Sequence, residues 1–296
     1  MRPGDDPDAG SQGGSTMRQT NGRAITVNGR SIHVEESGHG TDVVLFESGQ
    51  GLGRASWDPV LPLLADRARL VAYDRAGFGR SPRTDAPLDL DDLADDLVAL
   101  AEAVAPDRFV LVAHSMGGLV ARLAYQRLAP RLRGILMVDT TPETAPAFDA
   151  IDQIARRVDR TLAIAQPLVR SRLVARLFSG TARRVFPTDT YETMLAEDFV
   201  PAGLAQTRRE FRAVAAAVPR LRAEPPAPPG CPTVLLSADR PRRGGERTHP
   251  ALQEHQRHWT ETLPDGRYET VDAGHFIQGE RPDVVAARIR ELLDRG

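Results

Sequence analysis

The sequence contains no lysine, and all 38 of its basic residues are arginine. A chain without lysine cannot form a Schiff base with a carbonyl substrate, and it cannot build the lysine-containing phosphate loop of many nucleotide-binding proteins. A single cysteine, Cys231, excludes an internal disulfide and a cysteine-rich zinc site. We expect Cys231 to be a small buried hydrophobic residue.

Long apolar runs are absent as well. No stretch approaches the roughly 18 apolar residues of a membrane span, and the N-terminus lacks the basic and then apolar order of a signal peptide. We therefore expect no membrane span and, by default, a cytoplasmic location. The net charge of -2 gives no indication of a nucleic-acid partner.

What the 296 residues do contain, with 41% hydrophobic residues, is enough apolar material for one large α/β domain or two small ones. Residues 1–22 are mostly polar or glycine and show no apolar periodicity, so they are predicted to be a disordered leader. The sequence leaves open whether translation starts at Met1 or at Met17.

Beyond the leader, strand patterns and helix patterns alternate along the chain. This order is typical of a mainly parallel sheet that is covered by helices on both faces. The predicted strands are 24–27 and 31–35, which form a hairpin around Asn28-Gly29, and 43–46, 70–73, 109–113, 134–138, 233–236 and 268–271; the predicted helices are 57–65, 90–104, 118–126, 250–262 and 282–293. Residues 140–230 interrupt the alternation with arginine-rich helical segments, and we interpret them as an inserted helical cap.

The most informative stretch is the aliphatic strand 109–113, which is followed by Ser115 and then by a helix pattern. Ala113-x-Ser115-x-Gly117 matches the pattern G-x-S-x-G, with alanine in place of the first glycine. In such a strand, turn and helix, the serine hydroxyl projects at the carboxyl end of the strand, where the helix N-terminus stabilises negative charge. A serine that merely caps the helix is the alternative that these five residues leave open.

A serine nucleophile needs a histidine base that is itself oriented by a carboxylate. His275 follows the last predicted strand and precedes the last predicted helix, so we expect it at the same edge of the sheet as Ser115. His255 and His258 have the spacing of a metal pair on a helix. No third ligand frames this pair, and we predict no metal site.

Four motifs together resemble the α/β-hydrolase family, and the resemblance covers nearly all of the chain from residue 24 onward. The motifs are Ser48-Gly49-Gln50, where the family carries a His-Gly loop, Asp74-Arg75-Ala76-Gly77-Phe78-Gly79-Arg80-Ser81, which matches D-R-x-G-x-G-x-S, the serine turn, and Gly274-His275-Phe276. The resemblance implies a mainly parallel eight-stranded sheet flanked by helices, with a helical cap inserted after the sixth strand. The implied domains are an α/β-hydrolase core of residues 23–139 and 231–296 and a cap of residues 140–230.

The resemblance also implies roles for residues around the serine. The backbone N–H groups of Met116 and Gln50 would form the oxyanion hole. Asp74 and Arg75 are interpreted as a buried ion pair that stabilises their turn, and not as catalytic groups.

Two aspartates are candidates for the acid that orients His275. The family usually carries its acid after the strand that follows the cap, where this chain has Asp239, but the surrounding residues do not put Asp239 in the family's register. Some members carry the acid after the strand that precedes the cap, where this chain has Asp139. We favour Asp139 and keep Asp239 as the alternative; a helix N-cap is the purely structural interpretation of Asp139.

The serine decides which reaction the resemblance implies, because dehalogenases and epoxide hydrolases of this family use an aspartate nucleophile. We predict a serine hydrolase that cleaves a carboxylic ester, thioester or lactone of a small molecule through an acyl-enzyme on Ser115, with no cofactor. The alternatives are C–C bond hydrolysis, acyl transfer or perhydrolysis on the same fold, and a ligand-binding protein without turnover. The sequence indicates neither the substrate-binding residues nor the oligomeric state.

Overall fold

A computed structural model describes residues 21–84, 88–105, 107–241 and 245–295. Residues 1–20, which make up most of the expected leader, lie outside the described residues. The first strand, β1, spans Asn21–Val27, so the expected end of the leader at residue 22 falls inside this strand.

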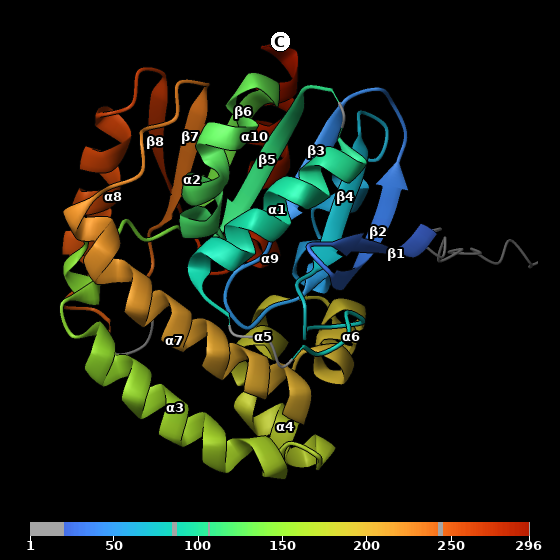
Figure 1. The fold of residues 1–296 in the computed structure, drawn as a ribbon, viewed down its shortest axis with the longest axis vertical. Coiled ribbons are helices and arrows are strands. Elements are labelled where there is room, and N and C mark those ends of the chain that lie inside the picture. The colour runs from blue at the N-terminus through green and yellow to red at the C-terminus, as the bar shows by residue number, and fades with distance from the viewer. Residues whose placement is uncertain (1–20, 85–87, 106, 242–244, 296) are drawn as a thin grey trace, which may run out of the picture.

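The described residues form one eight-stranded sheet with the order β1-β2-β4-β3-β5-β6-β7-β8 (Figure 1). Strand β1 pairs with β2 and β2 with β4 in antiparallel fashion, and the remaining neighbours are parallel. The other strands are β2 Arg30–Gly38, β3 Val43–Glu47, β4 Arg69–Asp74, β5 Phe109–His114, β6 Leu132–Val138, β7 Thr233–Ala238 and β8 Gly266–Val271. Strands β3, β5 and β7 are buried along their whole length, as parallel strands are when helices cover both faces.

Alternate residues of the central strands enter two different hydrophobic cores. Leu45 and Leu111 belong to a core shared with α1 and α2, whereas Phe46 and Val110 belong to a core shared with α10. Because side chains alternate across a strand, these cores lie on opposite faces of the sheet. The helices that correspond to predicted ones are α1 Leu90–Val104, α2 Gly117–Leu128, α8 His249–Glu261 and α10 Pro282–Asp294. The short helices η3 Ala129–Arg131 and α9 Ile277–Glu280 were not predicted.

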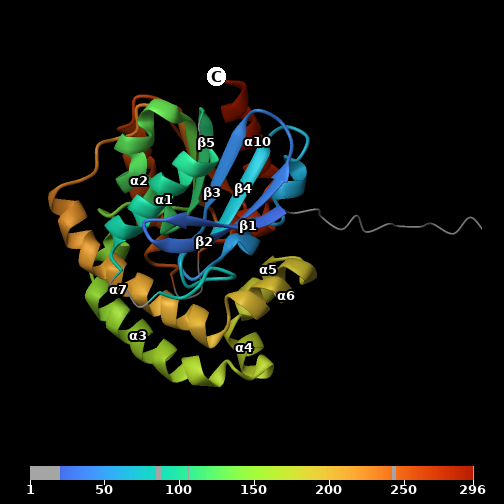
Figure 2. The same cartoon turned by 45° about the vertical axis from the view of Figure 1, so that its right-hand side comes forward.

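The chain between β6 and β7 is helical, as predicted, and lies at one end of the sheet (Figures 1 and 2). Its elements are η4 Pro146–Phe148, α3 Ile151–Leu168, α4 Arg172–Phe178, α5 Gly180–Val185, α6 Thr188–Glu197 and α7 Pro201–Ala223. Helices α3 and α7 pack against each other. A third hydrophobic core contains residues of all five helices from α3 through α7, together with Leu52 and Ala55 from the loop and the short helix that follow β3. Within the described ranges, no helix combines the length and the apolar character that crossing a membrane requires.

The predicted helix 57–65 is wrong. The chain instead forms two short 3-10 helices, η1 (Arg54–Trp57) and η2 (Leu61–Leu63). Pro59 and Pro62 explain the difference, because proline inside a helix removes a backbone donor and clashes with the preceding turn.

Candidate active site

Ser115 occupies the turn between β5 and α2. Its φ of +52° is a left-handed conformation that residues other than glycine rarely adopt. The Ser115 N–H donates to the carbonyl of Val138 at 3.0 Å, and the Gly118 N–H donates to the carbonyl of Ser115 at 3.0 Å. The turn is tight against β3, since a Cβ atom at Gly117 would lie 2.8 Å from the carbonyl oxygen of Ser48.

His275 faces a buried carboxylate. Its Nδ1 lies 2.6 Å from Oδ2 of Asp139, the residue that follows β6. The other carboxylate oxygen, Oδ1, accepts from the Ala238 N–H and from Gln256 Nε2, each at 3.2 Å. A carboxylate beside Nδ1 favours the tautomer with the proton on Nδ1, which leaves Nε2 as a proton acceptor.

Asp239, the alternative acid, lies in a different environment. It is exposed to solvent, whereas Asp139 is 4% exposed. The Asp239 N–H donates to the carbonyl of Val271 at 2.9 Å, and its carbonyl lies 3.2 Å from Nε2 of His249. The hydrogen bond to His275 is therefore made by Asp139, the aspartate that we favoured.

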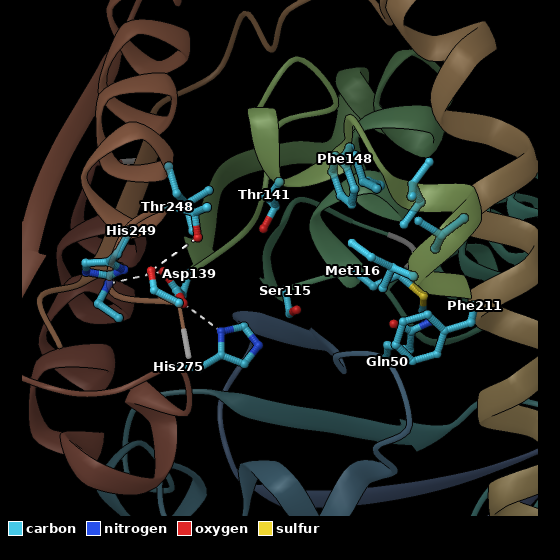
Figure 3. A pocket seen from close by; sticks show the side chains of 18 of the residues that line it. Gln50, Ser115, Met116, Asp139, Thr141, Phe148, Phe211, Thr248, His249 and His275 are labelled. Atoms are coloured by element: carbon cyan, nitrogen blue, oxygen red, sulfur yellow. Dashed lines mark hydrogen bonds and ion pairs between the residues drawn. The ribbon is translucent and has the colours of Figure 1, made fainter. Parts of the chain in front are cut away.

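Ser115 and His275 line the same cavity, which has a volume of about 260 Å³. The cavity lies between the carboxyl ends of the strands and helices α3 and α7. Figure 3 shows the ring of His275 directed toward Ser115, with Asp139 behind it. The strand order explains this meeting, because β5 and β6 are neighbours and the chain returns through β7 and β8 to bring His275 to the same edge.

The cavity has an apolar side and a polar side. The apolar side is formed by Met116, Leu119, Phe148, Ile151, Ile154, Phe211 and Val214, and polar side chains come from Thr141, Arg240, Thr248 and His249, with Leu252 one helical turn beyond Thr248. Figure 3 shows Phe148 and Phe211 on one side of Ser115, and Thr248 and His249 on the other. Of these lining residues the sequence predicted only Met116, through its backbone N–H. It could not predict the others, because a helix that lines a cavity has the same apolar period as a helix that packs on a core.

Gln50 and Met116 both line this cavity, and their backbone N–H groups have no acceptor among the described residues. Met116 directly precedes α2, so its N–H lies at the positive end of the helix. Gly49, beside Gln50, is close enough that a Cβ atom there would lie 3.3 Å from Cβ of Ser115. The loop after β3 therefore runs directly past the serine.

Ser48 replaces the family's histidine and holds this loop through its side chain. Its hydroxyl donates to the carbonyl of Gly53 at 3.1 Å and accepts from Nε1 of Trp57 at 3.1 Å. Both Ser48 and Trp57 are buried. The hydroxyl thus closes the loop upon itself across five residues.

Asp74 and Arg75 are both buried, but the expected ion pair between them is wrong. Asp74 pairs with Arg54 at 2.7 Å. Arg75 pairs instead with Glu47 at 2.7 Å and with Glu210 at 2.8 Å. Asp74 ends strand β4, and consecutive side chains of an extended chain point in opposite directions, so neighbouring residues find different partners.

Burial raises the pKa of two carboxyl groups near this loop. The pKa of Glu47 is raised by burial, although Arg75 opposes the shift. The pKa of Asp198 is raised well above its ordinary value by burial and by the nearby charge of Asp74. Desolvation disfavours the charged form of a carboxyl group, which explains both directions.

Residues with metal-binding chemistry do not gather in the part of the chain that the structure describes, where no group of three or more His, Cys, Asp or Glu side chains could hold a metal ion. His255 and His258 both lie on α8. Cys231 is buried, as predicted, and burial raises the pKa of its thiol to about 11. It therefore stays protonated at neutral pH.

This chain spans about half of the length of the curated relatives that it matches. A pimeloyl-[acyl-carrier protein] methyl ester esterase of Legionella pneumophila (strain Paris) is 34% identical over 120 residues, which cover 40% of this chain and 46% of the relative. A 2-(acetamidomethylene)succinate hydrolase of Mesorhizobium japonicum is 28% identical over 137 residues, which cover 46% of this chain and 48% of the relative.

Structural similarity extends over almost the whole chain. The structure of an epoxide hydrolase from Vigna radiata superposes with a TM-score of 0.77 at 18% identity, and it covers 94% of this chain and 99% of that chain. At this identity the likeness shows the shared fold alone.

A sequence model of the "Alpha/beta hydrolase family" matches residues 43–288, well over half of the chain. The fold predicted from the four motifs is thereby confirmed, and the chain belongs to the alpha/beta hydrolase family.

Proposed function

We propose that this hydrolase cleaves carboxylic esters of small molecules through an acyl-enzyme on Ser115. The observation that carries the proposal is the hydrogen bond of 2.6 Å between His275 Nδ1 and Asp139 Oδ2, in the same cavity as Ser115. A serine hydroxyl is a weak nucleophile at neutral pH, and a histidine held by a buried carboxylate is the base that activates it.

In the proposed reaction, His275 Nε2 takes the proton of Ser115 as Oγ attacks the ester carbonyl. The oxyanion that forms accepts hydrogen bonds from the N–H groups of Gln50 and Met116. His275 then returns the proton to the leaving alcohol, and the acyl group stays on Ser115. A water molecule, activated by the same histidine, hydrolyses this acyl-enzyme and restores the serine.

The helical segment 140–230 acts in this proposal as a cap over the cavity. Ile151 and Ile154 on α3, and Phe211 and Val214 on α7, line the cavity from this segment. The apolar side of the cavity is suited to an aliphatic or aromatic part of an ester. The name of the Legionella relative, a methyl ester esterase, supports the ester class, although the matched region covers less than half of that protein.

The test is hydrolysis of p-nitrophenyl esters of increasing acyl length by the wild type and by Ser115→Ala. The variant is expected to lose at least about 10³-fold in kcat, since the residual catalysis of such sites comes from binding and the oxyanion hole alone. The acyl length of the best substrate reports the depth of the apolar side. Equal activity of the two proteins would rule out a serine acyl-enzyme, and a folded wild type that neither hydrolyses these esters nor reacts with a fluorophosphonate would favour a binding protein.

A further inference from the structure

The loop that carries Gln50 is held by a buried arginine of the sheet domain. Arg75 donates from Nη1 to the carbonyl of Ser48 at 2.7 Å and from Nη2 to the carbonyl of Gly49 at 2.8 Å. The same guanidinium pairs with Glu47 at 2.7 Å. Arg75 is 3% exposed, so these are hydrogen bonds to a charged donor in a place that water does not reach.

A carboxylate of the helical segment completes this arrangement. Glu210, on α7, accepts from Arg75 Nε at 2.8 Å through Oε1. Its other oxygen, Oε2, accepts from the Gly51 N–H at 3.1 Å and from Arg75 Nη2 at 3.2 Å. Glu210 is completely buried, and both of its oxygens are used. One side chain of α7 therefore bonds both to the loop and to the arginine that holds the loop.

Two further contacts join the helical segment to the same loop. The Gly53 N–H donates to Asp198 Oδ2 at 3.1 Å. Gly51 has a φ of +74°, and a Cβ atom there would lie 3.1 Å from Oγ1 of Thr207. The residues on each side of Gln50 are thus fixed, Gly49 by Arg75 and Gly51 by Glu210.

We infer that Glu210 is a positioning residue, which holds the loop so that the Gln50 N–H points at the oxyanion. The inference rests on the proposed function and extends it to the cap. A donor of an oxyanion hole must lie about 2.7–3.1 Å from the developing charge, and small displacements of such a donor are costly. Helix α7 also carries Phe211 and Val214, which line the cavity. The same helix therefore contacts the substrate and fixes the donor that serves it.

The test uses Glu210→Gln, which keeps the size of the side chain but replaces one acceptor oxygen by a donor. An amide NH2 in the place of Oε1 loses the bond from Arg75 Nε, and an amide NH2 in the place of Oε2 loses the bonds from the Gly51 N–H and from Arg75 Nη2. Either orientation therefore weakens the hold of Glu210 on the arginine or on the loop itself. Asp96→Asn is the matched control. Asp96 lies on α1, is also a buried carboxylate at 5% exposure, and pairs with Arg30 at 2.9 Å. It does not line the cavity.

The main readout is the rate and the end point of labelling by a fluorophosphonate, which needs both an activated serine and an oxyanion hole. Glu210→Gln is expected to reach the same end point as the wild type but about 10- to 100-fold more slowly, with a matching fall in kcat and little change in KM. Asp96→Asn is expected to label at the wild-type rate.

Hydrogen exchange of the peptide that contains residues 48–53 gives a readout that does not depend on activity. We expect faster exchange in this peptide for Glu210→Gln and not for Asp96→Asn. Wild-type rates of labelling and exchange in Glu210→Gln would overturn the inference, as would a lower end point at an unchanged rate, which is the behaviour of a partly unfolded protein. A wild type that is never labelled would contradict the proposed function itself, and with it the inference.

Discussion

Ser115 and Asp139 share an unusual backbone conformation. With Asn28, they are the residues other than glycine that have positive φ among the described positions, at +52° for Ser115 and +44° for Asp139. Asn28 has an ordinary reason, since it lies in the Asn-Gly turn of the β1–β2 hairpin. Strained backbone of this kind costs of order 1–3 kcal/mol and is typical of functional sites. Strain at both Ser115 and Asp139 fits the proposal that they act together.

The two candidate acids can be separated by single substitutions. Asp139→Asn is expected to lower kcat by about 10³- to 10⁴-fold, because an amide beside Nδ1 favours the wrong tautomer of His275. Asp239→Asn is expected to change kcat by less than about twofold, since its side chain is exposed.

The measurement is the rate of ester hydrolysis under saturating substrate, with circular dichroism to show that both variants fold. A large loss in Asp239→Asn together with a nearly normal Asp139→Asn would contradict our assignment of the acid.

At the scale of single elements, the sequence predicted the sheet well because its signals are local. The predicted strand 70–73 and helix 90–104 correspond to β4 Arg69–Asp74 and α1 Leu90–Val104. The continuous apolar runs of the central strands and the Asp89 capping box at the start of α1 depend only on nearby residues.

The parts that the sequence could not predict depend on tertiary contacts. The partners of Arg75 lie 28 and 135 residues away, at Glu47 and Glu210, and no local pattern indicates such a pairing. The position of Asp139 beside His275 similarly depends on how β6, β7 and the last loop meet, so the motifs alone left two acids open. The lining of the cavity was unpredictable for the same reason.

The turn at Ser115 requires that the start of α2 packs closely against the end of β3 and the residue that follows it. A pair of glycine substitutions tests this packing. Gly117→Ala is expected to lower the free energy of unfolding by about 1–3 kcal/mol, because the added Cβ would lie 2.8 Å from the Ser48 carbonyl oxygen and must displace β3 or α2. Gly180→Ala is the control, since a Cβ atom there meets nothing within 4 Å, and the gain in helix propensity at α5 is at most about 1 kcal/mol.

Urea denaturation of the three proteins measures both effects. Equal stability of Gly117→Ala and the wild type would show that the turn at Ser115 tolerates a side chain at Gly117, which would contradict the close packing described above.

At the scale of the whole molecule, buried charges join the part of the chain that forms the sheet to the helical segment between β6 and β7. Arg54 pairs with Asp74 at 2.7 Å and with Glu197 at 2.6 Å, and Arg75 pairs with Glu210. Breaking a buried pair by removing one partner leaves an uncompensated charge, which typically costs several kcal/mol. The two parts of the molecule are therefore expected to unfold together.

The raised pKa of Asp198 makes stability depend on pH. A carboxyl group with a raised pKa in the folded state binds more protons when folded than when unfolded, so it lowers the free energy of unfolding as the pH rises from the ordinary carboxyl range toward the raised value. Asp198→Asn removes this titration while an amide oxygen still accepts from the Gly53 N–H. The variant is expected to gain stability relative to the wild type as the pH rises through this window.

Urea denaturation of the wild type and Asp198→Asn at several pH values provides the measurement. Parallel curves of stability against pH would show that Asp198 does not titrate with a raised pKa in the folded protein.

The central claim, an acyl-enzyme on Ser115, is tested most directly by trapping that intermediate. The wild type is mixed with a p-nitrophenyl ester, quenched in acid during the first turnover, and analysed by intact mass and peptide mapping. We predict a mass increase of one acyl group on the peptide that contains Ser115, and none in Ser115→Ala. Ester hydrolysis with no acyl adduct, or with the adduct on another residue, would contradict the account.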